Sequence, residues 1–376
     1  MECAILLIEI DDKGKCNLNK DALSIIETIE QPISAICVAG PYRTGKSFLL
    51  NRLIGRQDGF KIGPTVQACT KGIWMWNKPI KTNDGYTILL DTEGLGSFNR
   101  DIQIDTKIFT IAMLFSSFFI YNTLNSIDEK ALDTLSLVVN LSKYIHVKAK
   151  NPNMTEDLSE FSQLFPYFLW VIRDFSLKLL TTDRQYLENA LRPAEEVDEN
   201  AQKKNEIRAS ITNYFKERDC ITLVRPLGDE TELREIDYVK YEKLRQPFRE
   251  KVEQLITKVY TRCRPKSING IPLIGRMYAQ MISKYIEQIN SDSVPTIMTT
   301  WDQIVESEVS TLYTNAIKVF EDGFSKIVQE LPMEEAFLRG ALYNLKEATI
   351  KSFSSTEVQG NAAYHTYMQK HSNENN

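Results

Sequence analysis

The chain has 376 residues, 43% hydrophobic and 10% aromatic, which is enough to bury a core as one large domain or two ordinary ones. Its 45 basic and 50 acidic residues give a net charge of −5, and no basic run is interleaved with aromatic residues, which argues against nucleic acid as a partner. The six cysteines form no C-x-x-C pair and no secretory leader opens the chain, so we expect a reducing, cytoplasmic setting without a metal–cysteine site.

The chain opens with an apolar, extended segment over residues 4–10, followed by a turn and a short helix that ends before Pro32. We expect these first elements to serve packing. Residues 33–39 form a short apolar run that predicts a buried strand. Apolar side chains then recur at helical spacing over residues 48–54, so a strand and a helix flank residues 40–47.

The flanked segment, GPYRTGKS at residues 40–47, fits the phosphate-loop pattern G-x-x-x-x-G-K-[ST]. Gly40 and Gly45 allow a turn tight enough for backbone N–H groups to face a polyphosphate, and the helix start adds the positive end of its dipole. Lys46 supplies a positive charge for the β and γ phosphates, while Ser47 offers a hydroxyl to Mg²⁺. A coincidental turn is the alternative, and the flanking strand and helix disfavour it.

Two strand-like segments follow, over residues 71–80 and 86–91. Between them stands Asn83-Asp84-Gly85, a strong hairpin signal. Adjacent strands joined by a tight turn predict one antiparallel pair in an otherwise parallel sheet.

The second of these strands ends in a D-x-x-G motif, Asp91-Thr92-Glu93-Gly94. A carboxylate at this point can hold Mg²⁺ through a water molecule, and the Gly94 N–H can reach a γ-phosphate. A strand-terminating turn is the alternative. In the segment before the strand pair, Thr65 and Thr70 both offer hydroxyl ligands, and spacing alone does not choose between them.

Residues 108–127 carry no formal charge over a length that matches a membrane span. Several hydroxyl and amide side chains make the stretch too polar for a good span, namely Thr110, Ser116, Ser117, Asn122, Thr123, Asn125 and Ser126. The pattern favours a buried helix followed by a core strand near residues 118–121.

Further along, residues 131–141 show helical spacing and residues 167–172 read as another buried strand. Residues 181–219 are rich in charge and predict solvated helices, followed by a last strand over residues 221–224 and a polar loop over residues 225–237. Alternating helices and strands predict a three-layer α/β domain. Beyond it, apolar stripes at spacings of three and four predict a segment that is helical throughout.

A base-recognition element is the remaining part of a guanine-nucleotide site. Asn19-Lys20-Asp21 lacks the spacer of the N-K-x-D pattern and precedes the phosphate loop, so we discard it. Arg173-Asp174 directly follows the strand that ends at Ile172, at the sheet edge where a base would lie. An aspartate there can accept hydrogen bonds from guanine N1–H and N2–H₂, whereas a surface Arg/Asp pair is the plain alternative.

Four segments together resemble the large GTPase domain of guanylate-binding proteins, in the dynamin superfamily. They are GPYRTGKS at residues 40–47, TVQACTKGIWMW at 65–76, LDTEGLG at 90–96 and IRDFSL at 172–177. Atlastins, more distant relatives, share the Arg/Asp element but not the T-K-G-I-W-M-W run. The resemblance covers the GTPase domain and only the start of the family's long helical region.

The resemblance implies a fold and a division of the chain. The fold would be a three-layer α/β P-loop GTPase domain over residues 1–277, with a mostly parallel sheet that contains one antiparallel strand pair. An all-helical segment over residues 278–376 would begin the family's helical middle domain.

The resemblance also implies roles for particular residues. Arg43 resembles an arginine finger carried inside the phosphate loop, able to reach the γ-phosphate when two GTPase domains meet, an effect worth ~10³ to 10⁵ in rate in related systems. Thr70 resembles the Mg²⁺-binding threonine, and Glu93 resembles the carboxylate that helps place the attacking water. The loop at residues 225–237 corresponds to a guanine cap that covers the base and can build the dimer interface.

The predicted site follows from these roles. The catalytic residues are Arg43, Lys46, Thr70, Glu93 and Gly94. The nucleotide-binding residues are Gly40, Tyr42, Arg43, Thr44, Gly45, Lys46, Ser47, Phe48, Arg173, Asp174, Arg225, Pro226 and Leu227. Mg²⁺ is the expected cofactor, held by Ser47, by Thr70 and, through water, by Asp91.

The leading interpretation is a Mg²⁺-dependent GTPase that dimerises through its GTPase domains when GTP binds. One departure bears on its rate: guanylate-binding proteins typically have serine at the position of Ala68, which has no hydroxyl to orient water, and vertebrate members often have histidine at Cys69. A slow, GTP-dependent interaction module is therefore the alternative. An atlastin-like membrane-fusion GTPase would need an anchor, and an ATPase or kinase would bind ATP as well as GTP. Further hydrolysis to GMP and a peripheral membrane or cargo partner stay open.

Overall fold

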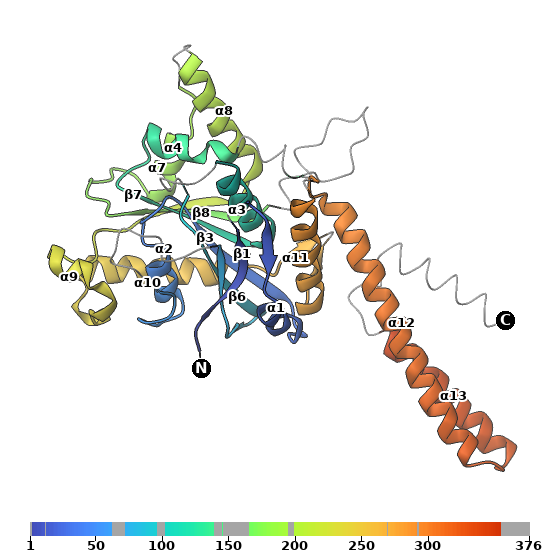
Figure 1. Cartoon of the computed structure of the whole chain (residues 1–376). Coiled ribbons are helices and arrows are strands. Elements are labelled where there is room, and N and C mark those ends of the chain that lie inside the picture. The colour runs from blue at the N-terminus through green and yellow to red at the C-terminus, as the bar shows by residue number, and fades with distance from the viewer. Residues whose placement is uncertain are drawn as a thin grey trace. The chain divides into compact units, whose positions relative to one another are not determined.

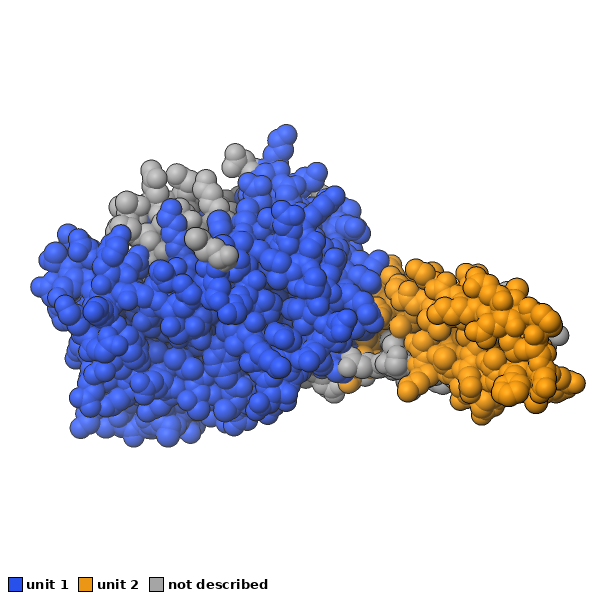
Figure 2. Space-filling view, turned by 90° about the horizontal axis from the view of Figure 1, so that it is seen from below, with its two compact units in different colours: residues 1–268, 272–297 blue, residues 269–271, 298–376 orange. Residues whose placement is uncertain are grey.

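The computed structural model describes residues 2–11, 13–61, 72–95, 102–138, 145, 165–194, 199–268, 270–291 and 293–354. The chain forms two compact units, one of residues 1–268 and 272–297 and the other of residues 269–271 and 298–376, which Figure 2 shows in blue and orange. The boundary expected after residue 277 falls inside helix α11 (Gly275–Asn290). This helix packs on α1 (Lys20–Glu27), and its Gly275 N–H donates to the Ile29 carbonyl over 2.8 Å. These contacts place α11 in the first unit.

Among the described residues, the first unit is built on a nine-stranded sheet with the order β2-β1-β4-β6-β3-β7-β8-β9, and β5 also pairs with β6. One side of the sheet, out to the edge strand β9, is parallel and consists of β6 (Gly85–Thr92), β3 (Ile33–Ala39), β7 (Phe118–Leu124), β8 (Tyr167–Arg173) and β9 (Arg218–Thr222). All seven residues of β3 are buried, as a strand covered on both faces requires. The mostly parallel α/β sheet predicted from the sequence is confirmed.

The other side of the sheet is antiparallel. β4 (Ile73–Trp76) and β5 (Ile80–Thr82) both pair antiparallel with β6, as the Asn83-Asp84-Gly85 turn predicts. β1 (Ala4–Ile10) pairs antiparallel with β4 and with β2 (Cys16–Leu18). The antiparallel part is thus larger than the single pair expected, because the apolar start of the chain extends the sheet.

Helices cover both faces of the sheet and give three layers (Figure 1). α2 (Lys46–Leu53) and α10 (Gln246–Arg262) pack on one face, where their apolar residues join a cluster with β3, β7 and β8. α3 (Ile102–Phe115) packs on β3 and contacts α11, which in turn contacts α1. The uncharged stretch over residues 108–127 is the second part of α3 followed by β7, as expected.

The remaining described elements before α12 connect these strands and helices along the chain. They are α4 (Glu129–Thr134), η1 (Leu135–Val138), α7 (Asp183–Ala190), α8 (Glu199–Tyr214), α9 (Glu230–Arg234), η2 (Ile236–Tyr238), η3 (Tyr241–Lys243), β10 (Ser267–Ile268) and β11 (Ile271–Pro272). The last strand, β9, begins before the predicted residue 221, and the predicted polar loop over residues 225–237 contains α9. The predicted solvated helices are α7 and α8.

The second unit contains most of α12 (Ile297–Gln329) and all of α13 (Glu335–Ser354), which confirms a helical segment after the sheet. The two helices come close at Gly323, where an added Cβ would stand 2.3 Å from Leu345 Cδ1. Within the described parts of the chain, no helix has the length and apolar character needed to cross a membrane.

Candidate nucleotide site

The phosphate-loop segment joins β3 to α2, so strand, glycine loop and helix follow one another as predicted. Gly45 forms the N-cap of α2 with φ 78°, and Gly40 has φ 147°. A Cβ on Gly40 would stand 2.1 Å from the Asn122 carbonyl oxygen of β7. Only glycine therefore fits where the loop leaves the sheet.

The loop is held from outside by two neighbouring segments. Asn122 Nδ2 donates to the Thr44 carbonyl over 2.7 Å, and the Thr44 hydroxyl donates to the Pro41 carbonyl over 3.0 Å. The Leu95 N–H donates to the Gly40 carbonyl over 3.1 Å, and the Tyr42 N–H donates to the Leu95 carbonyl over 3.0 Å. The role of Asn122 was not predicted from the sequence, where it is only a polar residue in an apolar stretch, whereas the structure shows a fully buried amide that needs a hydrogen-bond partner.

Lys46 is buried at the start of α2 with 6% of its surface exposed. Its Nζ donates to the Pro41 carbonyl over 3.1 Å, so the ammonium lies against its own loop. Burial lowers the pKa of Lys46 to about 8, while the charges of Asp91 and Glu93 act in the opposite direction. An anion beside this ammonium would stabilise its charged form, as a polyphosphate does.

Next to Lys46, the Ser47 hydroxyl donates to Asp91 Oδ2 over 2.6 Å. Asp91 lies at the end of β6 with 1% of its surface exposed, and its register opposite Val38 of β3 brings it to the loop. A hydroxyl and a carboxylate are oxygen donors of the kind that Mg²⁺ prefers, with phosphate and water oxygens to complete its shell. Within the described ranges, no group of three or more His, Cys, Asp and Glu gathers as a metal site.

The segment after Asp91 contacts both the loop and residue 72. The Glu93 N–H donates to the Gly72 carbonyl, and the Gly72 N–H donates to Glu93 Oε2, each over 2.9 Å. A Cβ on Gly94 would stand 2.5 Å from Tyr42 Cα, so glycine is required there. Thr65, Ala68 and Thr70 lie outside the described residues.

Arg43 occupies the exposed turn of the loop in a left-handed conformation, with φ 61°. Its guanidinium carbon lies 5.3 Å from the centroid of the Tyr42 ring. Positive φ is unusual for a residue with a Cβ and marks a position that the surrounding loop imposes.

Arg173 contacts the phosphate loop. From the sequence, we predicted that Arg173 and Asp174 together form the element that recognises the nucleotide base. Its Nη1 donates to the Gly45 carbonyl over 3.1 Å, and its guanidinium lies 5.3 Å from the Phe48 ring and 5.9 Å from the Phe248 ring. The group is buried, and burial lowers its pKa while Asp174 acts in the opposite direction. Arg173 thus binds the backbone of the loop while its guanidinium lies against the Phe48 ring.

Asp174 follows β8 with φ 55° and lines an open groove. Thr222, Arg225, Arg245 and Pro247 line the same groove. Pro226 and Leu227 are buried, and Leu227 belongs to the hydrophobic cluster under α2 and α10. Of the predicted residues from the cap, Arg225 is the one that reaches the groove with Asp174.

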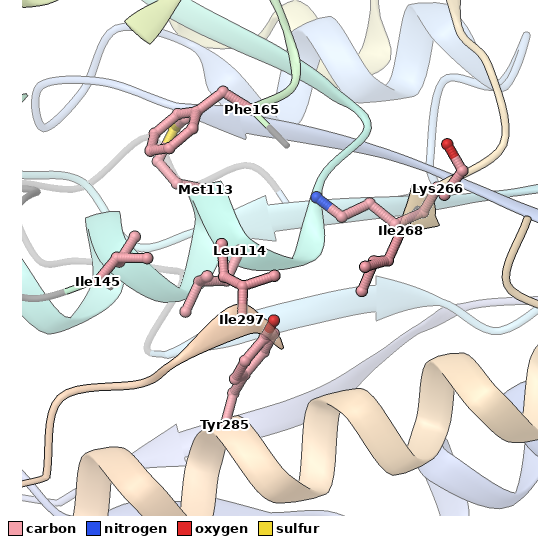
Figure 3. A pocket seen from close by; sticks show the side chains of 9 residues that line it. Met113, Leu114, Ile145, Phe165, Lys266, Ile268, Tyr285 and Ile297 are labelled. Carbon is pink, nitrogen blue, oxygen red and sulfur yellow. The ribbon is translucent and has the colours of Figure 1, made fainter. Parts of the chain in front are cut away.

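A separate small cavity lies away from this site, between α3, β10 and α11. Figure 3 shows its apolar lining and the Lys266 side chain at one side. Lys266 Nζ donates to the Ser116 carbonyl over 2.8 Å, and burial lowers the pKa of Lys266 to about 7. Nothing in the sequence predicts this burial, since a lysine next to a proline carries no signal of it.

A glycine loop between a buried strand and a helix, with an inward lysine and a hydroxyl–carboxylate pair, defines a P-loop nucleotide-binding domain. The chain belongs to the guanylate-binding protein family. Residues 13–267 match this family's description "Guanylate-binding protein, N-terminal domain", and residues 269–373 match its C-terminal domain.

Individual relatives agree. Guanylate-binding protein 4 from Homo sapiens is 37% identical over 304 residues, which is 78% of this chain and 47% of the relative. Guanylate-binding protein 3 from Mus musculus is 38% identical over 304 residues, with 78% and 49% covered. Guanylate-binding protein 6 from Homo sapiens is 36% identical over 338 residues, with 88% and 53% covered. The chain thus spans about half the length of the curated relatives it matches.

A crystal structure of Toc33 from Arabidopsis thaliana aligns with 64% of this chain and 88% of its own at 14% identity, with a TM-score of 0.34. The fold assignment therefore rests on the sheet described above.

Proposed function

We propose that the protein binds GTP and GDP and hydrolyses GTP with the help of Mg²⁺. The observation that carries the proposal is the convergence of Lys46 Nζ and the Ser47–Asp91 pair at the N-terminus of α2. A buried ammonium and a helix start favour phosphate oxygens, and the family relationship makes guanine the base. Asp174 would accept hydrogen bonds from guanine N1–H and N2–H₂, with Arg225 beside it in the groove.

The chemistry would be in-line attack of water on the γ-phosphate. Ser47, Thr70 and, through water, Asp91 would hold Mg²⁺, which when bound neutralises charge on the phosphates. Lys46 would stabilise the charge that spreads over the transferring group, and the Gly94 N–H would donate to the γ-phosphate. Glu93 would orient the water through a hydrogen-bond chain.

Arg43 would act as an arginine finger when two GTPase domains meet. Its place at the exposed turn of the loop supports this role. Dimerisation in the GTP state therefore belongs to the proposal, with the segment at residues 225–237 as part of the interface. The setting we propose is cytoplasmic, with a peripheral membrane or a cargo protein as a further partner. The products to be distinguished are GDP and GMP.

The second candidate is a GTP-dependent interaction module with slow turnover. Ala68 favours it, because alanine offers no hydroxyl to the attacking water. An Ala68→Ser variant separates the two: a large gain in turnover would show that the native site lacks a water-orienting group.

The experiment is GTP turnover at increasing protein concentration, with GDP and GMP quantified and ATP as the comparison nucleotide. We expect turnover per molecule to rise with concentration in the wild type and to stay low and flat in Arg43→Ala. Equal rates in the two proteins at every concentration would remove the arginine-finger role.

Asp174→Asn should weaken GTP binding and improve xanthosine triphosphate binding, because an amide donates where a carboxylate accepts.

A further inference from the structure

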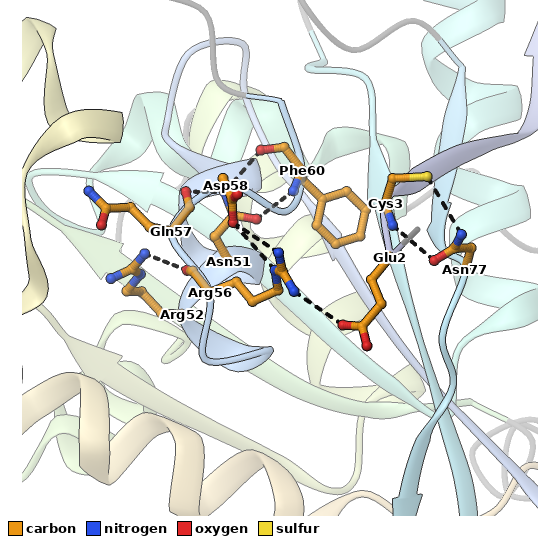
Figure 4. A network of polar contacts seen from close by, with 9 residues as sticks. All are labelled: Glu2, Cys3, Asn51, Arg52, Arg56, Gln57, Asp58, Phe60 and Asn77. Atoms are coloured by element: carbon orange, nitrogen blue, oxygen red, sulfur yellow. Dashed lines mark hydrogen bonds and ion pairs between the residues drawn. The ribbon is translucent and has the colours of Figure 1, made fainter.

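Arg52 lies in the last turn of α2, the helix that starts at the phosphate loop, and it is buried with 8% of its surface exposed. Its guanidinium carbon is 5.1 Å from the centroid of the Phe48 ring and 5.7 Å from that of the Tyr241 ring. Nη2 donates to the Arg56 carbonyl, one of the contacts drawn in Figure 4. The cation thus lies between a ring of its own helix and a ring from a distant segment.

That distant segment is residues 225–245, which we call the strap. Its two ends are joined: the Arg245 N–H donates to the Pro226 carbonyl over 2.9 Å, and Arg245 Nη1 donates to the Arg225 carbonyl over 3.3 Å. Arg225 and Arg245 also line the groove of Asp174. The ends of the strap therefore form one wall of the proposed base site.

The middle of the strap is fastened to α2 and to the turn after it. Gln57 Nε2 donates to the Val239 carbonyl over 2.7 Å, and Tyr241 packs on Arg52. The apolar side chains of Ile236 and Val239 pack against the cluster under α2. Burial lowers the pKa of Arg52, while the charge of the part-buried Asp237 in the strap acts in the opposite direction.

Arg52 is also linked to the phosphate loop through one ring. The Phe48 ring contacts two guanidinium groups: its centroid lies 5.1 Å from that of Arg52 and 5.3 Å from that of Arg173. Arg173 donates in turn to the Gly45 carbonyl. A continuous series of contacts therefore runs from Gly45 through the two arginines to Tyr241.

A buried guanidinium is costly unless its partners repay the lost hydration. Among the described residues, the Arg52 Nε finds no hydrogen-bond partner. An apolar side chain would fill this space without that cost, so packing alone does not explain an arginine between two rings. Attraction between the cation and the ring faces does explain it.

We propose that Arg52 is a positioning residue for the guanine-nucleotide site, which clamps the strap to α2 and so holds Arg225 and Arg245 beside Asp174. The inference rests on the proposed function in that a guanine nucleotide occupies the Asp174 groove. Loss of the clamp loosens the wall of the groove and lets the nucleotide leave faster, while the phosphate loop keeps its form.

The test compares Arg52→Met with Arg56→Met in the full chain. Arg56 follows the end of α2, with 38% of its side chain exposed, and its side chain pairs with Glu2 and Asp58 and lies over the Trp76 ring, all outside the strap. We expect Arg52→Met to exchange amide hydrogens faster over residues 229–245 without nucleotide, and to release a fluorescent GDP about tenfold faster. Exchange over residues 33–45 should not change, and Arg56→Met should match the wild type in both measurements.

Tyr241→Leu provides a second variant, because Tyr241 is only half-buried at the margin of the cluster under α2 and leucine keeps an apolar side chain there. This change also removes the hydrogen bond from the Tyr241 hydroxyl to the Arg249 carbonyl. It should reproduce both effects, and adding Arg52→Met to it should give little more, since both changes break one contact. Wild-type exchange and release in Arg52→Met, or fully additive effects in the double variant, would overturn the proposal. If the wild type binds no GDP, the proposed function fails, and the exchange measurement without nucleotide still decides whether the clamp exists.

Discussion

The guanidinium of Arg173 donates to the backbone carbonyl of Gly45 over 3.1 Å, although 128 residues separate the two along the chain. Gly45 is the N-cap of α2, and a Cβ there would stand 2.7 Å from Arg173 Nη1. The end of β8 therefore supports the phosphate loop, and the side chain that follows, Asp174, faces the groove. On the proposed function, these adjacent residues would serve the phosphate end and the base end of one nucleotide.

Loss of the hydrogen bond from Arg173 to the Gly45 carbonyl should weaken nucleotide binding more than it lowers the stability of the fold. Arg173→Met keeps an apolar stem between Phe48 and Phe248 but loses the hydrogen bond to Gly45. A charge-assisted hydrogen bond is worth about 1.5 kcal/mol, so we expect about tenfold weaker GDP binding by fluorescence titration. Arg192→Met, at an exposed position, is the control. Unchanged affinity in Arg173→Met would show that the loop holds its form without Arg173.

Gly40 should not tolerate a side chain. Gly40→Ala places a Cβ against the Asn122 carbonyl and also strains a backbone with φ 147°. We expect a loss of about 2 kcal/mol or more in the free energy of unfolding, measured with urea. The control is Gly228→Ala, since an added Cβ there meets nothing within 4 Å and the change should stay within about 0.5 kcal/mol. Equal losses in both variants would contradict the contact with Asn122.

Nucleotide binding should depend on pH through Lys46. Its pKa of about 8 in the free protein should rise when phosphates surround the ammonium, so binding takes up a proton once the pH exceeds 8. GDP affinity should be flat at lower pH and then fall by up to about tenfold per pH unit. Lys46→Arg provides the control, because its guanidinium does not titrate in this range while any titration of guanine itself persists. The same fall in both proteins would assign the effect to the nucleotide.

Lys266 should make the folded state more stable as the pH rises. Its pKa is lowered to about 7 by burial, whereas an unfolded lysine titrates near 10.4. Between these values the unfolded chain binds more protons, so the contribution of Lys266 to stability rises with pH, by up to about 1.4 kcal/mol per unit.

The measurement is urea unfolding of the wild type and Lys266→Met from about pH 6 to about pH 9. Above pH 7, we expect the free energy of unfolding of the wild type to increase steadily relative to that of the variant, because methionine binds no proton in either state. Parallel pH profiles would mean that the buried lysine keeps its charge throughout, held by its contact with the Ser116 carbonyl.

Much of the site could be predicted from the sequence because its parts are local. A glycine loop needs particular backbone angles at Gly40 and Gly45, and a strand that ends just after Asp91 presents the Asp91 carboxylate at the sheet edge. Parallel pairing of β3 with β6 then brings Asp91 to Ser47 without any further information.

Long-range contacts were beyond the sequence. Asn122 reads as a polar interruption of an apolar stretch, and nothing local shows that its amide holds the Thr44 carbonyl. The apolar start of the chain looks the same whether it packs on a surface or, as β1, pairs with β4. In the same way, helical spacing predicts α11 but does not tell which compact unit it joins.

The sequence by itself determined the phosphate loop, the D-x-x-G strand end and the alternation of helices and strands, because these depend on backbone angles and on periodicities within a few residues. Only the tertiary structure decided that Arg173 supports the loop, that Phe48 lies between two guanidinium groups and that Arg52 meets Tyr241. Those contacts join segments far apart in the chain, and their partners are chosen by the packing of α2 and α10 on the sheet, which no local pattern encodes.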